Sequence, residues 1–309
     1  MLADLHADTL YECFVHQKTM DDTSLHIHRL IFEKIEGYLQ NFACYLPEDT
    51  PDKWRFLQDF IAFGQKELRS MGFKMSYETA SMSRGRSAIL SVENCDVFDE
   101  SEDPTDKLLF LKNNGVHIIS LVYNHTGRLG CGAFSEQDEG LSLLGRRVVS
   151  AANKTGMILD VSHASRKSAE DILALASAPV LATHSNSFSL CPHPRNLTDE
   201  QIVRIAESGG LIGVNLYPPF LSEKVADRKD VAKHIQYMVN LCGEDHVALG
   251  GDLDGVERLP SGVKNLGSLL SLTDELHKCG IGETAAEKIF YKNVMNFAKE
   301  NFGGKHEIH

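Results

Sequence analysis

Short apolar runs alternate with longer amphipathic segments along this chain. Eight of the runs are rich in apolar and β-branched residues, and they predict strands over residues 2–10, 37–46, 87–93, 116–123, 157–162, 179–183, 210–216 and 247–251. Most of these runs are almost continuously apolar, which is typical of parallel strands that are buried on both faces.

The segments between the runs have the composition and periodicity of helices. They predict helices over residues 49–71, 139–155, 165–176, 198–208, 227–241, 264–278 and 282–301. The helix over 198–208 has the clearest ends, because Thr198 and Gln201 have the spacing of a capping box and Gly209 follows its last residue. Strands that alternate with helices predict a parallel sheet.

Eight such units in 309 residues predict an α/β fold, a single-domain (β/α)8 TIM barrel over residues 1–309. The competing architecture is an open, doubly wound sheet. A GxGxxG turn after the first strand would support that alternative, and the sequence has none there.

Composition narrows the class of protein. Apolar residues make up 42% of the chain and charged residues 24%, which is ordinary for a globular domain. The net charge of −12 disfavours a nucleic-acid partner. The chain has no apolar run of membrane-spanning length and no recognisable signal peptide, and its tail is polar, so we expect no membrane partner. Seven scattered cysteines without a CxxC pair indicate free thiols in the cytoplasm.

Histidines and carboxylates stand at the carboxyl ends of the predicted strands, where barrel enzymes build their active sites. The relevant stretches are LHADTL, ILSVEN, ILDVSH, VLATHSNS and ALGGDLDG, which contain His6, Asp8, Glu93, His163, His184, Asp252 and Asp254. His6 and Asp8 are two residues apart, so on a strand both would point to the same face.

Each of these residues also has an ordinary explanation when it is taken alone. The HxD pair could lie on the surface, Glu93 could form a salt bridge at the rim, and either later histidine could belong to the core. Together they favour a metal site, because imidazole nitrogens and carboxylate oxygens are common ligands of zinc. Asp252 is the better candidate for chemistry than Asp254, since it lies closer to the strand end and Asp254 begins an Asp-Gly turn.

The same stretches resemble the membrane dipeptidase (renal dipeptidase) family, metallopeptidases among the amidohydrolase-like barrels. The matching segments follow the order of the family along nearly the whole chain: LHADTL at 5–10, SVEN at 91–94, YNH at 123–125, LDVSHAS at 159–165, THSNS at 183–187, CPHPRNLTDEQI at 191–202, GVNLYP at 213–218 and GGDLDGV at 250–256. The CPHPRN segment is the most specific of them, because many amidohydrolases share the HxD pair.

The resemblance implies a centre of two zinc ions per chain. His6 and Asp8 would hold one ion, His163 and His184 the other, and Glu93 would bridge both. Other divalent metals stay open, because nitrogen and oxygen ligands accept several of them.

The resemblance also implies roles for four residues around the metals. His125 would contact the substrate or the reaction intermediate, and Asp252 would exchange protons with the metal-bridging water. Arg195 would receive the terminal carboxylate of the substrate, and Tyr217 would line the pocket.

These roles describe a zinc-dependent dipeptidase that uses a metal-bridging hydroxide on small dipeptides, including ones with a D-residue at the C-terminal position. The alternatives are another binuclear barrel acting on a different amide, lactone or ester, and a catalytically silent barrel. Arg195 would instead form a rim salt bridge with Asp199 or Glu200 if it has no substrate role. Homodimers are common in the family, so a second copy is the expected protein partner.

Overall fold

Eight parallel strands form the centre of the molecule in a computed structural model that describes residues 1–75 and 85–302. The strands are β1 (Leu2–Ala7), β2 (Tyr38–Tyr45), β3 (Arg86–Glu93), β4 (Val116–Ser120), β5 (Ile158–Asp160), β6 (Val180–Leu181), β7 (Ile212–Val214) and β8 (Val247–Leu249). The first six pair in chain order in one sheet, and β7 pairs with β8. Parallel bridges between Ala182 and Ile212 and between Ala7 and Leu253 join the two sheets at both ends. The predicted barrel is thereby confirmed, and the open sheet is excluded.

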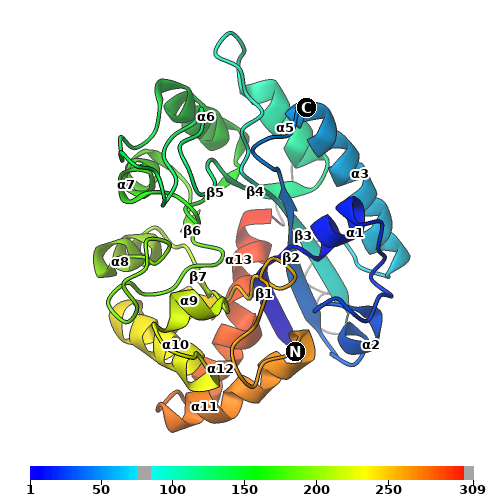
Figure 1. Cartoon of the computed structure of the whole chain (residues 1–309), viewed down its shortest axis with the longest axis vertical. Coiled ribbons are helices and arrows are strands. Elements are labelled where there is room, and N and C mark those ends of the chain that lie inside the picture. Colours follow the sequence, from blue (N-terminus) through cyan, green and yellow to red (C-terminus); the bar gives the residue numbers. More distant parts are fainter. Residues whose placement is uncertain (76–84, 303–309) are drawn as a thin grey trace.

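Helices surround this ring of strands (Figure 1). They are α1 (Thr9–Val15), α2 (Arg29–Phe32), α3 (Lys53–Ser70), α5 (Thr105–Asn113), α6 (Leu143–Thr155), α7 (Arg166–Leu175), α8 (Asp199–Glu207), α9 (Pro218–Leu221), α10 (Arg228–Cys242), α11 (Thr273–Lys278), α12 (Glu283–Glu287) and α13 (Asn293–Phe302). The predicted capping box is present, with the Thr198 side chain on the Gln201 N–H and the Gln201 side chain on the Thr198 N–H. A 3-10 segment (Leu266–Leu272) precedes α11, and a π-helical segment (Lys288–Lys292) separates α12 from α13.

The predicted strands are present, and all but β3, which begins one residue earlier at Arg86, are shorter than predicted. The first prediction is wrong over its last residues. β1 ends at Ala7, and α1 begins at Thr9. Thr9 and Leu10 are buried, so the apolar run continues into the buried face of a helix. Hydrophobicity alone does not show where a buried strand gives way to a buried helix. Helices α1, α2, α5 and α9 were not expected from the sequence.

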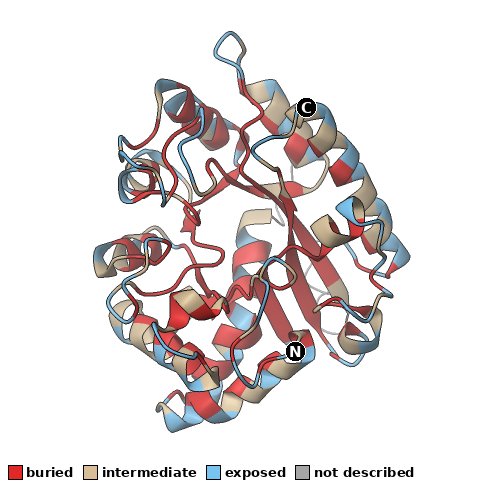
Figure 2. Ribbon diagram, viewed as in Figure 1, coloured by how far each residue is buried: buried red, intermediate tan, exposed pale blue. Residues whose placement is uncertain are grey.

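The interior of the barrel is filled at its amino-terminal end. Side chains from the strands and their flanks meet the end of the chain in one cluster of Ala3, Leu5, Leu39, Ile89, Ile118, Ile158, Leu181, Leu211, Ala248, Tyr291, Val294, Phe297 and Ala298. α13 therefore closes this end, and Figure 1 shows it across the middle of the ring. The strands themselves are buried almost throughout (Figure 2). This packing leaves the opposite end of the barrel for polar side chains.

None of the described helices is long and apolar enough to cross a membrane.

Candidate active site

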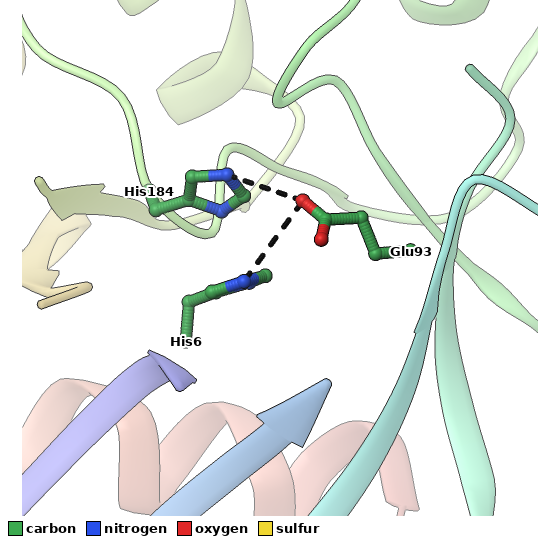
Figure 3. Close-up of side chains that lie close together, drawn as sticks. All are labelled: His6, Glu93 and His184. Atoms are coloured by element: carbon green, nitrogen blue, oxygen red, sulfur yellow. Dashed lines mark ion pairs between the residues drawn. The ribbon is translucent and has the colours of Figure 1, made fainter. Parts of the chain in front are cut away.

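The predicted polar residues meet at the carboxyl end of the barrel. His6 lies near the end of β1, Glu93 is the last residue of β3, and His184 follows β6. Figure 3 shows these three side chains converging on one point from separate elements. The Oε1 atom of Glu93 lies 3.9 Å from His6 Nε2 and 3.5 Å from His184 Nε2. His163, after β5, comes closer still, with its Nε2 atom 2.8 Å from the same oxygen.

The hydrogen bonds of His163 and His184 fix which ring nitrogens are free. The amide oxygen of Asn124 accepts from His163 Nδ1 at 2.8 Å. The hydroxyl of Thr183 donates to Asp160 Oδ2 at 2.6 Å, so its oxygen accepts from His184 Nδ1 at 2.9 Å. Burial lowers the pKa of both histidines well below the usual value, and the charges of Arg195 and His6 act in the same direction. Each neutral ring therefore presents the lone pair of Nε2.

These lone pairs face one another without a proton between them. The Nε2 atoms of His163 and His184 are 2.8 Å apart, and both face the Glu93 carboxylate. Two lone pairs and a carboxylate oxygen at such distances repel unless a proton or a metal cation lies among them. The donor set and its tautomers therefore fit a metal ion, as metal-binding histidines donate their other N–H to a nearby acceptor.

A second donor group lies beside the first and shares His6. His6 Nε2 is 3.4 Å from Asp8 Oδ2 and 3.9 Å from Asp252 Oδ1. The His6 Nε2 and Asp8 Oδ1 atoms are buried and have no hydrogen-bond partner. A Cβ atom on Gly255 would lie 2.1 Å from Asp8 Oδ2, so only glycine keeps this space open. Two overlapping groups of side chains, His6–Glu93–His184 and His6–Asp8–Asp252, have donor atoms close enough together to hold a metal ion.

Asp8 reaches this group by a route that the sequence did not predict. It is the N-cap residue of α1, with φ −99° and ψ 14°, and it lies outside β1. The expectation that His6 and Asp8 share one face of a strand is therefore wrong, although their side chains do approach each other. The turn into α1, which begins directly after Asp8, brings the carboxylate back over the end of the barrel.

The carboxylates make this cluster strongly negative. Burial alone would lower the pKa of His6, but Asp8, Glu93 and Asp252 outweigh it and raise the value to about 10. Burial and the neighbouring acids raise the pKa of Glu93 to about 8 and that of Asp252 to about 6. Bound cations would replace the protons that these groups otherwise take up.

Backbone strain is concentrated in the segments that carry these side chains. Among the described residues, five other than glycine have φ in the left-handed region, and four of them are Asn94, His163, Asp252 and Asp254. Such conformations cost of order 1–3 kcal/mol each and cluster at functional sites. At His163 and Asp252, the left-handed backbone conformation directs the side chain into the end of the barrel.

The two aspartates after β8 have different surroundings. Asp252 Oδ2 accepts from Asn215 Nδ2 at 3.0 Å, while its other oxygen faces His6. Asp254 instead accepts from the Thr9 hydroxyl and the His26 N–H, both at 2.5 Å. Asp254 therefore ties together the loops around α1 and α2, and Asp252 is the one with an oxygen turned toward the cluster.

A cavity of about 380 Å³ opens beside the cluster and contains Arg195. Arg195 is 4% exposed, and its Nε and Nη2 atoms have no hydrogen-bond partner. The Asp199 carboxylate accepts hydrogen bonds from the hydroxyls of Ser189 and Tyr237. The rim salt bridge between Arg195 and Asp199 that was considered from the sequence is therefore not formed. Tyr217 lines the same cavity, as expected. A buried, unpaired guanidinium is costly, and its free N–H groups match a carboxylate ligand.

The structure places His125 outside the lining of this cavity, with its ring centroid 6.3 Å from that of Phe134. His125 is exposed and lines a separate hollow with Glu48, Lys53 and Arg128. Tyr123, two residues earlier, stacks on the His163 ring with centroids 4.3 Å apart and lines the main cavity. It also lines a smaller cavity of about 190 Å³ on the Asp8 side of the cluster. Sequence reasoning missed Tyr123, although it stands in the same YNH segment.

Three further residues of the main cavity were also missed: Phe134, His193 and Phe220. His193 stands two residues before Arg195 in the CPHPRN segment, and that proximity was the available signal. Phe134 lies in the long connection between β4 and α6, and Phe220 lies in the short helix α9. Neither position belongs to a periodic segment that would indicate its direction.

Comparisons with known proteins identify the family of the chain. The model of the family described as membrane dipeptidase (peptidase family M19) matches residues 1–305. An uncharacterised Klebsiella pneumoniae protein in the pqqA 5′ region is 35% identical over 60% of this chain and 72% of its own length. The dipeptidase aclJ of Aspergillus oryzae is 38% identical over 46% of the chain, which spans about a third (34%) of that protein.

A solved structure shares the fold. The metallopeptidase of Rhodobacter sphaeroides, crystallised with a phosphinate mimic of the dipeptide L-Ala-D-Ala, superposes with a TM-score of 0.83 at 24% identity. The match covers 97% of this chain and 99% of the other.

Proposed function

Because the chain belongs to the membrane dipeptidase family, peptidase family M19, we propose that it hydrolyses dipeptides with two zinc ions at the carboxyl end of its barrel. The observation that carries the proposal is the convergence of three imidazole Nε2 atoms on the Glu93 carboxylate, beside an unpaired, buried Arg195. The imidazoles around Glu93 would serve hydrolysis, and Arg195 would serve recognition of a free carboxylate.

The proposed ligands divide between two ions. Asp8 and His6 would hold one ion, His163 and His184 the other, and Glu93 would lie between them. Bound divalent ions supply a water molecule that is acidic enough to act as a nucleophile near neutral pH. Neutral histidines and two carboxylates suit zinc, which has no strong preference for one geometry.

The remaining polar groups divide the other tasks. Arg195 would bind the terminal carboxylate of the substrate through its two free nitrogens, which a longer peptide would not present at the same distance. Asp252 would accept a proton through the oxygen that faces His6 and pass it to the leaving amine. Asn215 holds the other oxygen of Asp252 and so fixes the direction of that transfer.

Tyr123 is better placed than His125 to donate a hydrogen bond to the reacting carbonyl. Burial raises the pKa of the Tyr123 phenol, and Glu93 and Tyr45 add to the effect, so the hydroxyl keeps its proton. We expect Tyr123→Phe to lower kcat by roughly 10²-fold with little change in KM, as loss of one oxyanion donor does elsewhere. His125→Ala should change kcat less than about twofold by the same reasoning. Steady-state kinetics of both variants would test this, and the reverse ranking would return the role to His125.

Recognition of the free carboxylate provides the test of the proposed function. The zinc-loaded enzyme should cleave a dipeptide such as Ala-Ala and leave its C-terminal amide largely intact. Arg195→Ala should lower kcat/KM for Ala-Ala by roughly 10²- to 10³-fold, the scale of a buried, charged hydrogen-bonded pair. In the same assay, Arg195→Ala should change kcat/KM for an uncharged ester only slightly. Equal losses on both substrates would mean that Arg195 does not recognise the carboxylate, and an enzyme active on esters alone would refute dipeptidase activity.

A further inference from the structure

Four aromatic side chains form one side of the main cavity, and we call them the aromatic wall: Tyr217, Phe220, His193 and Phe134. Their rings follow one another in contact. The centroids of Tyr217 and Phe220 are 4.9 Å apart, those of Phe220 and His193 4.5 Å, and those of His193 and Phe134 5.8 Å. All four residues line the cavity that holds Arg195. The wall thus runs from Tyr217 past the buried Phe220 ring to Phe134, which is 41% exposed at the outer end.

The wall begins where a substrate carboxylate would bind. The Arg195 Cζ atom lies 5.4 Å from the centre of the Phe220 ring, so this ring supports the guanidinium by a cation–π contact. A carboxylate on the free nitrogens of Arg195 would therefore lie beside the wall. In a dipeptide, that carboxylate belongs to the C-terminal residue, so the side chain of this residue starts within reach of the same rings.

Hydrogen bonds fix the wall before any substrate arrives. Asn196 donates through Nδ2 to the carbonyl oxygens of Phe220 and Cys191, both at 2.8 Å. At the other end, the Phe134 N–H donates to the Asn124 carbonyl at 2.7 Å, and the preceding N–H of Ala133 donates to the His163 carbonyl at 2.8 Å. The wall is thus connected to the same segments that carry Arg195 and the metal ligands. A preformed apolar surface binds a side chain at a lower entropic cost than a mobile one.

The charges around the cavity mouth disfavour an acidic side chain. Glu257 lines the same cavity and is exposed there. Burial and the charge of Arg195 lower the pKa of His193, which leaves that ring neutral. His163, a second basic group of the lining, is a proposed metal ligand, and Arg195, the third, would already be occupied by the terminal carboxylate. Pro219 and Val256 complete the apolar part of the lining.

We propose that this enzyme prefers dipeptides whose C-terminal residue has a large apolar side chain, aromatic ones above all. The inference rests on the proposed function and adds the substrate class of the same site. A large apolar side chain gains binding free energy when it is buried against the wall, and an aromatic ring gains more by stacking on it. A C-terminal glycine or alanine leaves the wall uncovered.

A series of dipeptides with constant N-terminal alanine tests the proposal. The zinc-loaded enzyme is assayed with Ala-Gly, Ala-Ala, Ala-Leu, Ala-Phe and Ala-Asp, each chiral C-terminal residue in its L and D form. In the preferred configuration, kcat/KM should rise from Ala-Gly to Ala-Phe by roughly 10- to 200-fold, the range over which hydrophobic pockets discriminate. Ala-Asp should fall below Ala-Ala. Equal rates along the series, or a preference for Ala-Ala or Ala-Asp, would overturn the proposal.

Substitution of the outer ring shows whether the wall is the cause. Phe134→Ala should lower the ratio of kcat/KM for Ala-Phe over Ala-Ala by about tenfold, and Phe134→Leu should lower it less. Leu175→Ala is the matched control, since Leu175 is 38% exposed on α7 and does not line the cavity. The control should keep the ratio of the wild type. An unchanged ratio in Phe134→Ala would overturn the role of the wall while leaving the dipeptidase intact, whereas an enzyme that cleaves no member of the series would refute the proposed function as well.

Discussion

Glu93→Gln is expected to remove metal binding and hydrolysis together. Glu93 Oε1 is the atom on which three imidazoles converge, at 2.8, 3.5 and 3.9 Å. The amide of glutamine has nearly the same shape but no charge, so two dications would lose a shared anionic ligand. We expect the metal content to fall below one ion per chain and kcat/KM to fall by more than roughly 10³-fold, because the nucleophile depends on the metals.

The control for this variant is a buried acid outside the cluster. Asp96 is also buried and lies three residues after Glu93, where it pairs with Lys53 at 2.7 Å and Arg128 at 3.0 Å. Asp96→Asn should lower the free energy of unfolding while the folded protein keeps its metal and its activity. Thermal unfolding, elemental analysis and kinetics are measured on both variants. A Glu93→Gln protein that retains two metals and full activity would refute the proposed centre.

Asp252→Asn is expected to give the second largest effect, now with the metal retained. Asparagine can still accept the hydrogen bond from Asn215, so the loop should keep its conformation. It cannot take up a proton as a carboxylate does, and general acid–base groups contribute typically 10²- to 10⁴-fold to the rate. We therefore expect kcat to fall within that range while KM stays within about threefold of the wild type.

The neighbouring aspartate separates this role from a structural one. Asp254 accepts hydrogen bonds from Thr9 and His26, so Asp254→Asn should reduce stability by about 1–3 kcal/mol. Its kcat should remain close to that of the wild type. Urea unfolding and steady-state kinetics on both variants distinguish the two positions. If Asp254→Asn loses kcat and Asp252→Asn retains it, the assignment of proton transfer to Asp252 is wrong.

Sequence patterns were sufficient for the barrel and for the approach of the main polar residues. Eight apolar runs define the strands, and parallel strands bring their carboxyl ends together whatever the helices between them do. This is why Glu93, His163 and His184 meet in the structure although they are far apart in the sequence. The rule depends only on strand direction, which the alternation of strands and helices already implies.

The parts that could not be predicted depend on irregular backbone. β4 ends at Ser120, so the alternation of strand faces no longer applies at Tyr123 and His125, and sequence alone did not show which ring enters the site. Asp8 reaches His6 through the turn into α1 rather than along a strand. The Phe134 N–H donates to the Asn124 carbonyl, and the Phe220 carbonyl accepts from the Asn196 side chain. Hydrogen bonds of this kind leave no periodic signal in the sequence.

Several expectations remain predictions. They include zinc as the native metal, two ions per chain, a D-residue in the substrate, the cytoplasmic location and a homodimer. The metal-related ones all depend on the donor atoms around Glu93.

The most direct measurement is a zinc titration of the chelated, purified enzyme with Ala-Phe and Ala-Ala as substrates, followed by elemental analysis. We predict that activity disappears on chelation and returns in proportion to added zinc, reaching its plateau at two ions per chain. Activity that survives complete removal of metal, or a fully zinc-loaded protein that cleaves neither dipeptide, would contradict the account.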